Sequence, residues 1–378
     1  MSVADQFLFG YDDGHCLLTG SRELSSAILV RLLGATDATM APDSAPLVTG
    51  LALPETQEFA FCVTWSAPEA PRPGAVWAHA LIVDEALLRD PQALEVLLGL
   101  PRRPSADGPD LGRYTAPLSL DAKAPVPPSY LAERSLDPQL LESLVSMAYR
   151  PHGDRIVVHR DLDGAARALL ALWAAQWPQL RAGFSFRTRE IVRGGASPFD
   201  LTVSRKIRGL HDDSSASPST RTPAWVSAVV EDAASPGPTP LREFLWAFGP
   251  QERPDPRRLR RLAALWLRVA ADDAAQVQAH LERYWPRPRS GAALKLALFG
   301  RGNDDWWRLD EPTRVVSLWQ AAKPAWDVDE LELADRVRAL LEARQLPGLL
   351  SSLPEHPPPE IGDALLGRLS TSGTDQGP

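Results

Sequence analysis

Cysteine is scarce in this chain. Among its 378 residues only Cys16 and Cys62 are cysteines, and no Cys-x-x-Cys spacing occurs. A disulfide scaffold and a cysteine-based zinc site are therefore excluded, and we expect no bound metal. Two such thiols fit a reducing compartment.

Long apolar runs are also missing. No stretch approaches the ~18 consecutive apolar residues of a membrane span, and residues 1–10 lack the charged start and long apolar core of a signal peptide. We therefore expect a cytoplasmic protein with no membrane partner. Hydrophobic residues make up 44% and charged residues 23%, as in ordinary globular proteins, and the length predicts two or three domains.

The chain has no surplus of positive charge. Its net charge of −8 and its pI near 5.5 argue against nucleic acid as a partner. Only four of the 40 basic residues are lysines, and the 36 prolines are about twice the usual share of ~5%. This bias is typical of a GC-rich genome, so clusters of arginine are weaker evidence of function here.

The common catalytic signatures do not occur. The sequence has no GxxxxGK[ST] loop for nucleotide phosphates, no G-x-S-x-G elbow and no H-E-x-x-H helix. A P-loop NTPase is excluded. We expect a protein that is not an enzyme and has no cofactor.

Residues 1–132 are predicted to form an N-terminal α+β domain that ends in a proline-rich linker over 101–132. Asp-Asp-Gly at 12–14, between two apolar runs, predicts a hairpin because glycine supplies the positive φ of a tight turn. Serines before an apolar run predict a short helix over 26–34. Apolar patterning predicts three further elements: strands over 59–65 and 75–83 and a helix over 85–100.

Residues 133–237 are predicted to form a middle α+β domain. Asp137 and Pro138 predict the start of a helix, and residues 164–177, rich in alanine and leucine, predict another. Short apolar runs predict four strands, over 156–160, 183–192, 199–207 and 225–232. Residues 212–222 have the composition of a surface loop.

Residues 238–378 are predicted to form an all-α domain with a disordered tail over 369–378. Apolar residues at helical spacing predict a helix over 257–270. Acidic residues and prolines at helix starts predict three more helices, over 274–285, from Asp310 and Pro312, and from Asp327 or Asp329. The predicted fold class is therefore α+β, with two mixed α/β domains followed by an all-α helical domain.

Polar residues suited to binding gather in the predicted hairpin and in the following loop and strand. The candidate binding residues are Tyr11, His15, Ser21, Arg72, Trp77 and His79. A catalytic interpretation brings His15 and His79 together as an acid/base pair or as metal ligands, with Cys16 or Ser21 as the nucleophile. The structural interpretation, which we favour, makes His79 a core histidine bonded to a backbone carbonyl or a carboxylate.

The helical part offers candidates for partner contact. Arg257, Arg258 and Arg261 stand at the start of a predicted helix, where they could meet phosphates or an acidic protein. The alternative, which we favour because the whole chain is rich in arginine, is a solvated helix face. Trp306 and Trp307 are adjacent and cannot share one helix face. One of these two tryptophans is therefore a candidate for contact with a partner.

Three stretches of the N-terminal part form a combined pattern: QFLFGYDDGHCLLTGSREL at the start, TW at 64–65, and RPGAVWAHALIV at 72–83. Together they resemble the N-terminal domain of the bacterial GTPase-associated protein 1 family. The middle part, with AGFSFRTR and FDLTVSR, is similar to the middle domain of that family, and the helical remainder stands where its C-terminal domain would. Cys16 and Ala78 depart from the family pattern, which favours a basic residue and a hydroxyl residue there.

The resemblance implies a component of bacterial conflict systems that are centred on a GTPase. The leading hypothesis is a non-enzymatic adaptor for defence that binds a partner GTPase or other proteins of the system. Within this hypothesis, Arg72 could act in trans as an arginine finger. Two alternatives stay open: a hydrolase-type effector that uses the His15/His79 region, and a nucleic-acid sensor that uses the arginines of 253–268.

Overall fold

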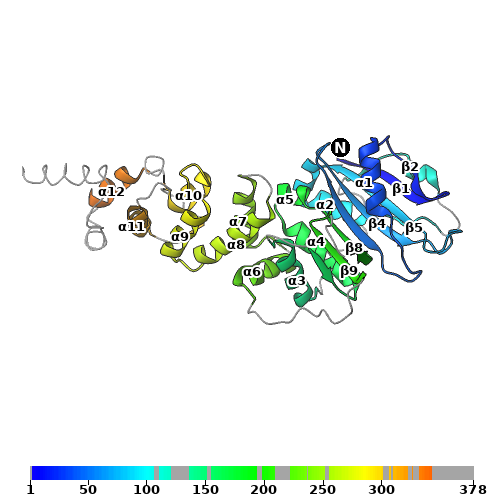
Figure 1. Cartoon of the computed structure of the whole chain (residues 1–378). Helices are drawn as coiled ribbons and strands as arrows, with labels where there is room; N and C mark the ends of the chain where they lie inside the picture. Colours follow the sequence, from blue (N-terminus) through cyan, green and yellow to red (C-terminus); the bar gives the residue numbers. More distant parts are fainter. Residues whose placement is uncertain are drawn as a thin grey trace, which may run out of the picture. The chain divides into compact units, whose positions relative to one another are not determined.

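The chain divides into two compact units, Met1–Arg260 and Arg261–Pro378. The computed structural model describes residues 2–105, 110–120, 136–150, 155–193, 198–208, 222–235, 237–251, 255–300, 306–307, 310–321, 326 and 332–342. The first unit carries a mixed sheet with helices around it, and the second unit is helical (Figure 1). The predicted α+β fold class, with helices concentrated in the C-terminal half, is confirmed.

Nine strands of the described residues form one sheet. Their bounds are β1 Val3–Tyr11, β2 His15–Gly20, β3 Leu47–Leu53, β4 Glu58–Ser66, β5 Val76–Asp84, β6 Leu118–Ser119, β7 Ile156–Val158, β8 Phe186–Arg193 and β9 Leu201–Arg208. The order across the sheet is β2-β1-β5-β4-β3-β8-β9-β7, and β6 pairs with β1. Neighbours from β2 to β8 are antiparallel, whereas β8, β9 and β7 are parallel.

The N-terminal hairpin forms as predicted. Asp13 has a φ of 54° and Gly14 a φ of 154°, so the turn between β1 and β2 is made by the residues that tolerate such angles best. The helix α1 (Ser26–Thr36) begins at the predicted cap, because the Ser25 hydroxyl accepts a hydrogen bond from the N–H of Ile28. The two predicted strands after it are confirmed as β4 and β5.

Part of the predicted pattern of the first unit is wrong or incomplete. The strand β3 was not predicted, and the helix expected over 85–100 is divided into a short 3-10 helix η1 (Glu85–Arg89) and α2 (Pro91–Gly99). Proline at the start of α2 explains the division, because it lacks the N–H that would continue the first helix. A further 3-10 helix, η2 (Leu111–Tyr114), precedes β6.

Both faces of the sheet are covered, and strand alternation decides which side chains point to each face. Phe7 and Ala60 belong to the core that includes Leu32 of α1. On the other face, Phe59 stacks on Trp173, with ring centroids 5.0 Å apart. Trp173 belongs to α4 (Leu162–Ala175), so α1 and α4 lie on opposite faces of the sheet.

Strands from the first two predicted domains share this sheet. Pairing of Gly50 on β3 with Phe186 on β8 joins them. A Cβ atom at Gly50 would lie 2.4 Å from the Phe186 ring, so glycine allows the aromatic side chain to lie against β3. The division into three domains over 1–132, 133–237 and 238–378 stays a prediction.

The first unit contains further helices among its described residues. They are α3 Pro138–Ala148, α4, α5 Pro178–Gly183, α6 Ala224–Ala234 and α7 Pro240–Phe248, followed by the 3-10 helix η3 Gly249–Gln251 and by α8 Pro256–Val269, which runs into the second unit. The strand predicted over 225–232 is wrong, since these residues belong to α6. Val226, Val229 and Ala233 are buried at helical spacing, which places them on one face of that helix. Residues 212–221 of the predicted surface loop lie outside the described residues.

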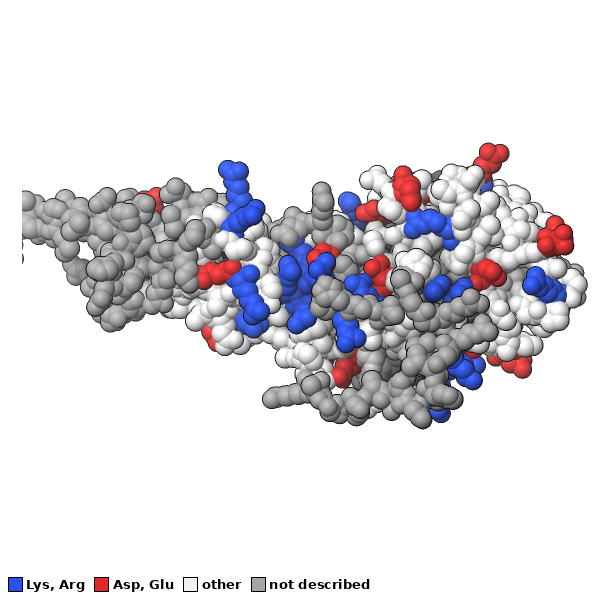
Figure 2. Space-filling model, in the orientation of Figure 1, with Lys and Arg blue, Asp and Glu red and all other residues white. Residues whose placement is uncertain are grey.

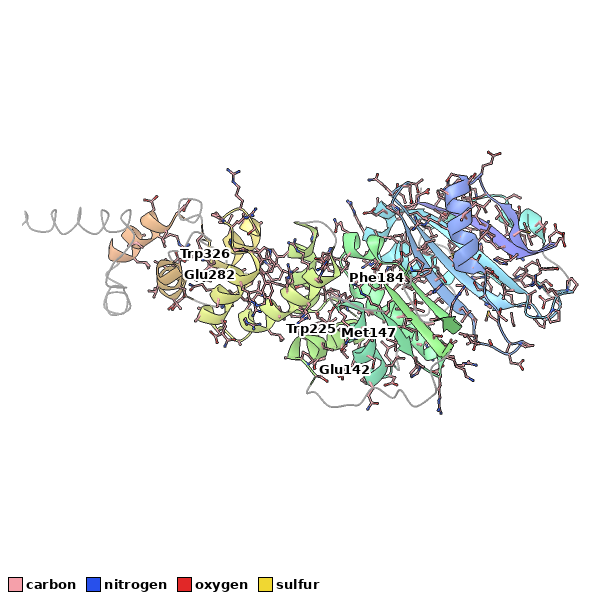
Figure 3. All side chains as sticks on the ribbon, viewed as in Figure 1. Glu142, Met147, Phe184, Trp225, Glu282 and Trp326 are labelled. Carbon is pink, nitrogen blue, oxygen red and sulfur yellow. The ribbon has the colours of Figure 1, made fainter. Side chains whose placement is uncertain are left out.

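The second unit contains α9 Ala274–Tyr284, α10 Ala292–Phe299, α11 Glu311–Ala321 and α12 Leu333–Glu342. The predicted helix over 274–285 is confirmed, whereas α10 was not predicted. Trp326 packs edge-on against Phe299 with centroids 5.1 Å apart, and its indole N–H lies 3.4 Å from a carboxylate oxygen of Glu282 (Figure 3). Among the described residues, every helix is too short or too polar to cross a bilayer. The predicted tail lies outside these residues.

Candidate functional site

His79 lies in the sheet on β5 and is 1% exposed. Its Nδ1 accepts a hydrogen bond from the backbone N–H of Arg102 (3.0 Å), so the ring proton is on Nε2, which lies 3.2 Å from Gln6 Oε1. Burial, together with the charge of Arg102, lowers the pKa of His79 to about 3. The imidazole is therefore neutral at neutral pH, and both nitrogens are bonded. Its partners are the side-chain amide oxygen of Gln6 and the backbone N–H of Arg102, where the sequence predicted a backbone carbonyl or a carboxylate.

His15 begins β2. Its half-buried ring stacks on Phe9, a residue of the core under α1, with centroids 6.2 Å apart. Its Nε2 lies 2.9 Å from the hydroxyl oxygen of Thr36, and that hydroxyl donates its own proton to the carbonyl of Leu32. The imidazole must therefore donate to Thr36. Burial lowers the pKa of His15, and the nearby Asp37 partly opposes this shift.

The two histidines lie on opposite faces of the sheet. His79 is paired with Leu8 of β1, and its ring meets Tyr114 edge-on at 5.0 Å, on the face where Leu8 and Tyr114 pack together. Phe9, the next residue of β1, points to the other face, where it carries the His15 ring. The structure therefore does not bring His15 and His79 together as an acid/base pair or as metal ligands.

The two candidate nucleophiles have structural contacts. The Ser21 hydroxyl donates to Asp5 (2.8 Å) and accepts from the backbone N–H of Gln6 (3.0 Å), which holds the end of β2 against β1. Cys16 is half-buried, and its sulfur lies 3.8 Å from the carbonyl oxygen of Asp12. Neither side chain hydrogen-bonds a histidine among the described residues. Within the residues that the structure describes, no three side chains of His, Cys, Asp or Glu lie close enough together to bind a metal ion.

Trp77 of β5 covers the end of the hairpin. A Cβ atom at Gly10 would lie 2.2 Å from the Trp77 ring, so glycine lets the indole lie against β1. The indole N–H donates to a carboxylate oxygen of Glu69 (2.7 Å), and the same carboxylate pairs with Arg103 (2.7 Å). Burial raises the pKa of Glu69, but hydrogen bonds from its backbone, Trp77 and Arg103 outweigh burial and lower it. These contacts fasten the loop 67–75, between β4 and β5, to the sheet.

The same loop carries Arg72 to the end of the hairpin. The guanidinium carbon of Arg72 lies 5.7 Å from the centre of the Tyr11 ring, a cation–π arrangement. Arg72 is exposed and makes no ion pair with a described residue, and Asp12 and Asp13 of the turn are exposed beside Tyr11. We call Tyr11, Asp12, Asp13 and Arg72 the hairpin-end surface. On the face shown in Figure 2, basic and acidic side chains are interspersed over this strand-rich part.

The candidate arginines of α8 are divided between the two units. In the first unit, the exposed Arg257 pairs with Asp255 at 3.3 Å, whereas Arg258 is only 3% exposed and donates to a backbone carbonyl. In the second unit, the guanidinium of Arg261 lies 5.2 Å from the centre of the Tyr284 ring. Only Arg257 and Arg261 of the three thus keep surface that a partner could reach.

The two adjacent tryptophans have different surroundings. Trp307 is 1% exposed and packs edge-on against Phe299, with ring centroids 5.0 Å apart. Trp306 is half-buried. Of the pair, Trp306 is therefore the one with surface available for partner contact.

Three residues that hold this region together were not among the candidates predicted from the sequence: Gln6, Glu69 and Arg103. Gln6 lies 73 residues from its partner His79, and Arg103 lies 34 residues from Glu69. Separations of this size leave no periodic signal in the sequence, because only the pairing of the strands brings the side chains together.

The described geometry defines the class of protein: a mixed α+β sheet domain that presents a fastened loop at the end of a hairpin, followed in the chain by a helical unit. Residues 3–100 match the family model of the GTPase-associated protein 1, N-terminal domain type 1. This match confirms the resemblance that the N-terminal motifs indicate, and it includes the whole hairpin-end surface. No curated protein and no solved structure matched the chain.

Proposed function

We propose that this protein is a non-enzymatic adaptor that binds a partner GTPase through the hairpin-end surface. The observation that carries the proposal is Arg72, which is exposed, has no ion pair among the described residues and stacks on Tyr11 inside the matched domain. The description of that domain, GTPase-associated, supports a GTPase as the partner. A role in a bacterial conflict system and a cytoplasmic location are part of the same proposal.

The chemistry of the surface suits protein recognition. Tyrosine and arginine are enriched at the residues that dominate binding energies, since each combines a large contact area with directed polar groups. The loop that carries Arg72 is held by Glu69, which bonds both Trp77 and Arg103. A partner would therefore meet a side chain whose loop is already ordered, which lowers the entropy cost of binding.

The contacts of the histidines favour this proposal over a hydrolase-type effector. A general base needs a free lone pair within reach of the proton that it removes. The Nδ1 lone pair of His79 accepts from the N–H of Arg102. His15 lies on the other face of the sheet, and among the described residues neither Ser21 nor Cys16 offers it a proton. The nucleic-acid alternative has less support, because Arg258 is buried and Arg257 already pairs with Asp255.

Arg72 also favours a second, regulatory role as an arginine finger. An arginine finger must be exposed and uncommitted to a carboxylate, and Arg72 meets both conditions within the described residues. Such a residue supplied in trans accelerates GTP hydrolysis by ~10³–10⁵-fold in other GTPases. Single-turnover hydrolysis by the captured GTPase tests this role. A rate that is equal with the wild-type adaptor and with Arg72→Ala would exclude it.

The adaptor proposal is tested by affinity purification of the tagged full chain from its native cells. The lysate is divided between GDP and a non-hydrolysable GTP analogue, and retained proteins are identified by mass spectrometry. We expect one GTPase to be retained in one nucleotide state, with capture reduced at least about tenfold by Arg72→Ala or Tyr11→Ala.

The matched control is Arg89→Ala, which removes an exposed arginine from η1 in the same matched domain. This variant should retain the GTPase as the wild type does. Recovery of no GTPase by a folded bait, or equal capture by Arg72→Ala and wild type, would overturn the proposal.

A further inference from the structure

The first unit contains a cavity of about 550 Å³. None of the residues that line it belongs to the hairpin-end surface. Side chains of α2, α4 and α7 form its walls, together with the segment between α6 and α7. Most of these side chains are apolar, among them Leu94, Ala171 and Trp246. The volume lies within the ~300–1,000 Å³ of pockets that hold small organic ligands.

Arg181 of α5 contributes to the cavity wall and is 1% exposed. Its terminal nitrogens donate to three backbone carbonyls, those of Leu88, Ala174 and Gln176. Its Nε is buried and has no hydrogen-bond partner among the described residues. Burial, together with the charge of Arg242, lowers the pKa of Arg181 to about 9, which still leaves the guanidinium charged at neutral pH.

The other charged groups of the cavity do not neutralise Arg181. Arg242 pairs with the buried Asp232 at 3.1 Å, and Arg167 pairs with Asp163 at 3.1 Å. The two carboxylates of the wall, Glu95 and Glu243, belong to exposed residues that make no ion pair with Arg181.

A positive charge without a counter-ion is therefore buried beside an open space. A carbonyl oxygen offers only partial charge, so three carbonyls do not balance a full guanidinium charge in a medium of low dielectric. A ligand with an acidic group would supply the missing negative charge, and the apolar walls would receive an apolar body.

We propose that this cavity binds a small amphipathic anion, with its acidic group against Arg181 and its apolar body against Leu94, Ala171 and Trp246. The guanidinium of Arg181 lies 5.5 Å from the centre of the Trp246 ring, so the charged and the aromatic parts of the wall adjoin. The site goes beyond the proposed adaptor function, because it shares no residue with the hairpin-end surface.

Arg181 also has a structural role that must be separated from ligand binding. Two of its acceptors, the carbonyls of Ala174 and Gln176, are at the C-terminal end of α4, where a cation stabilises a helix. That role uses the terminal nitrogens and leaves Nε unused. Replacement of Arg181 can therefore destabilise the fold. For this reason the tests below also use the wild-type chain and a variant that keeps Arg181.

The first test compares two dyes on the wild-type full chain. Anilinonaphthalene sulfonate and N-phenylnaphthylamine share the same aromatic body, but only the first carries an anionic group. Only the sulfonate can place a negative charge against Arg181, so we expect the sulfonate to bind about tenfold or more tightly than the uncharged dye. Decanoate or decyl phosphate should displace it and decanol should not, and the ratio of the two acids tells which anionic group fits better. Equal binding of the two dyes would overturn the proposal.

The second test places the site in the cavity. Ala174→Phe fills the space from α4 and leaves the backbone carbonyl that Arg181 uses, whereas Ala27→Phe puts the same ring on an exposed position of α1. We expect the first variant to lose sulfonate binding and the second to keep it, with similar melting temperatures. Binding that survives Ala174→Phe would overturn the proposal. Where Arg181→Met folds, it should bind the two dyes equally, and a retained preference for the sulfonate would equally overturn it.

Discussion

Gln6 and His79 face each other across adjacent strands, and each fixes the hydrogen-bonding role of the other. The Gln6 amide nitrogen donates to the carbonyls of Arg113 and Ala116, at 2.9 and 2.6 Å, so its oxygen is the atom that faces His79. The imidazole can meet that oxygen only by donating from Nε2, as its bond from Arg102 also requires. The pair thus joins β1 and β5 to the chain before β6, and it keeps the imidazole neutral.

This neutral, buried imidazole makes stability depend on pH. The pKa of His79 is about 3 in the folded state and 6.5 in the unfolded state, so below pH 6.5 the unfolded chain binds a proton that the folded chain does not. The contribution of the neutral His79 to the free energy of unfolding is fully present above pH 6.5. It is lost as pH falls toward 3, by about 1.4 kcal/mol per pH unit. From about pH 7 to about pH 5, urea unfolding of the first unit should lose about 2 kcal/mol through this residue.

The variant His79→Asn provides the comparison, because asparagine can donate and accept but does not titrate. Its unfolding free energy should be lower than that of the wild type at neutral pH and should change less between the two pH values. His280 of the second unit, whose pKa burial lowers to about 4, adds a separate pH dependence that His280→Asn removes. A His79→Asn variant with the slope of the wild type would show that His79 is not the source.

Replacement of glycine by alanine should have opposite effects on stability at Gly10 and at Gly34. At Gly10 a Cβ atom would lie 2.2 Å from the Trp77 ring and 2.8 Å from Leu18, so Gly10→Ala must displace the indole and should cost about 1–3 kcal/mol. At Gly34, inside α1, a Cβ atom meets nothing within 4 Å, and Gly34→Ala should stabilise the fold by about 0.5–1 kcal/mol. Thermal unfolding measures both. Equal effects would show that the Trp77 contact does not require glycine.

In the helical unit, the pair of Arg336 and Glu311 joins α12 to α11. The Arg336 side chain is fully buried and meets the carboxylate through two bonds, of 2.6 and 2.9 Å. Glu311→Gln removes the charge that faces this buried cation, so it should destabilise the unit by about 3 kcal/mol. The exposed pair of Arg31 and Glu55 is the control, since Glu55→Gln should cost less than about 1 kcal/mol. Denaturant unfolding should rank the two variants in this order, and the reverse order would contradict the argument.

The elements that could be predicted from the sequence are those set by residues close together in the chain. The hairpin, the capped start of α1 and the strands β4 and β5 each follow from residues close together in the chain. The error at α6 has a physical reason, because tryptophan and valine favour strands, whereas the residues of α6 that this fold buries, Val226, Val229 and Ala233, follow helical spacing. The strand β3 escaped prediction since its Gly50 weakens the strand pattern, yet it accommodates Phe186 from a distant part of the chain.

The candidate site was only partly predictable for a related reason. The sequence identified Tyr11, Arg72 and Trp77, but it could not show that the first two stack on each other. Nor could it place His15 and His79 on opposite faces, because that depends on the pairing register of β1 with β2 and β5. Charge pairs such as Glu69 with Arg103 have no local signature at all.

Glu69 holds the loop that positions Arg72. The loop 67–75 is closed by a hydrogen bond from the Ala67 N–H to the Ala75 carbonyl (2.9 Å), and Glu69 is its link to Trp77 and to Arg103. Glu69→Ala removes both links, while the Arg72 side chain itself is not changed. We expect faster amide hydrogen exchange over 67–75 and weaker capture of the partner GTPase, by about tenfold or less, since only the ordering of the loop is lost.

Two comparisons make this prediction specific. Arg103→Ala breaks the same ion pair from the other side, so it should also raise exchange in the loop, but by less, since Trp77 still holds Glu69. Glu55→Ala removes an exposed carboxylate of the same domain and should change neither exchange in the loop nor capture. Faster exchange with undiminished capture would mean that the partner orders the loop on binding, and then Arg72 would act without the support of Glu69.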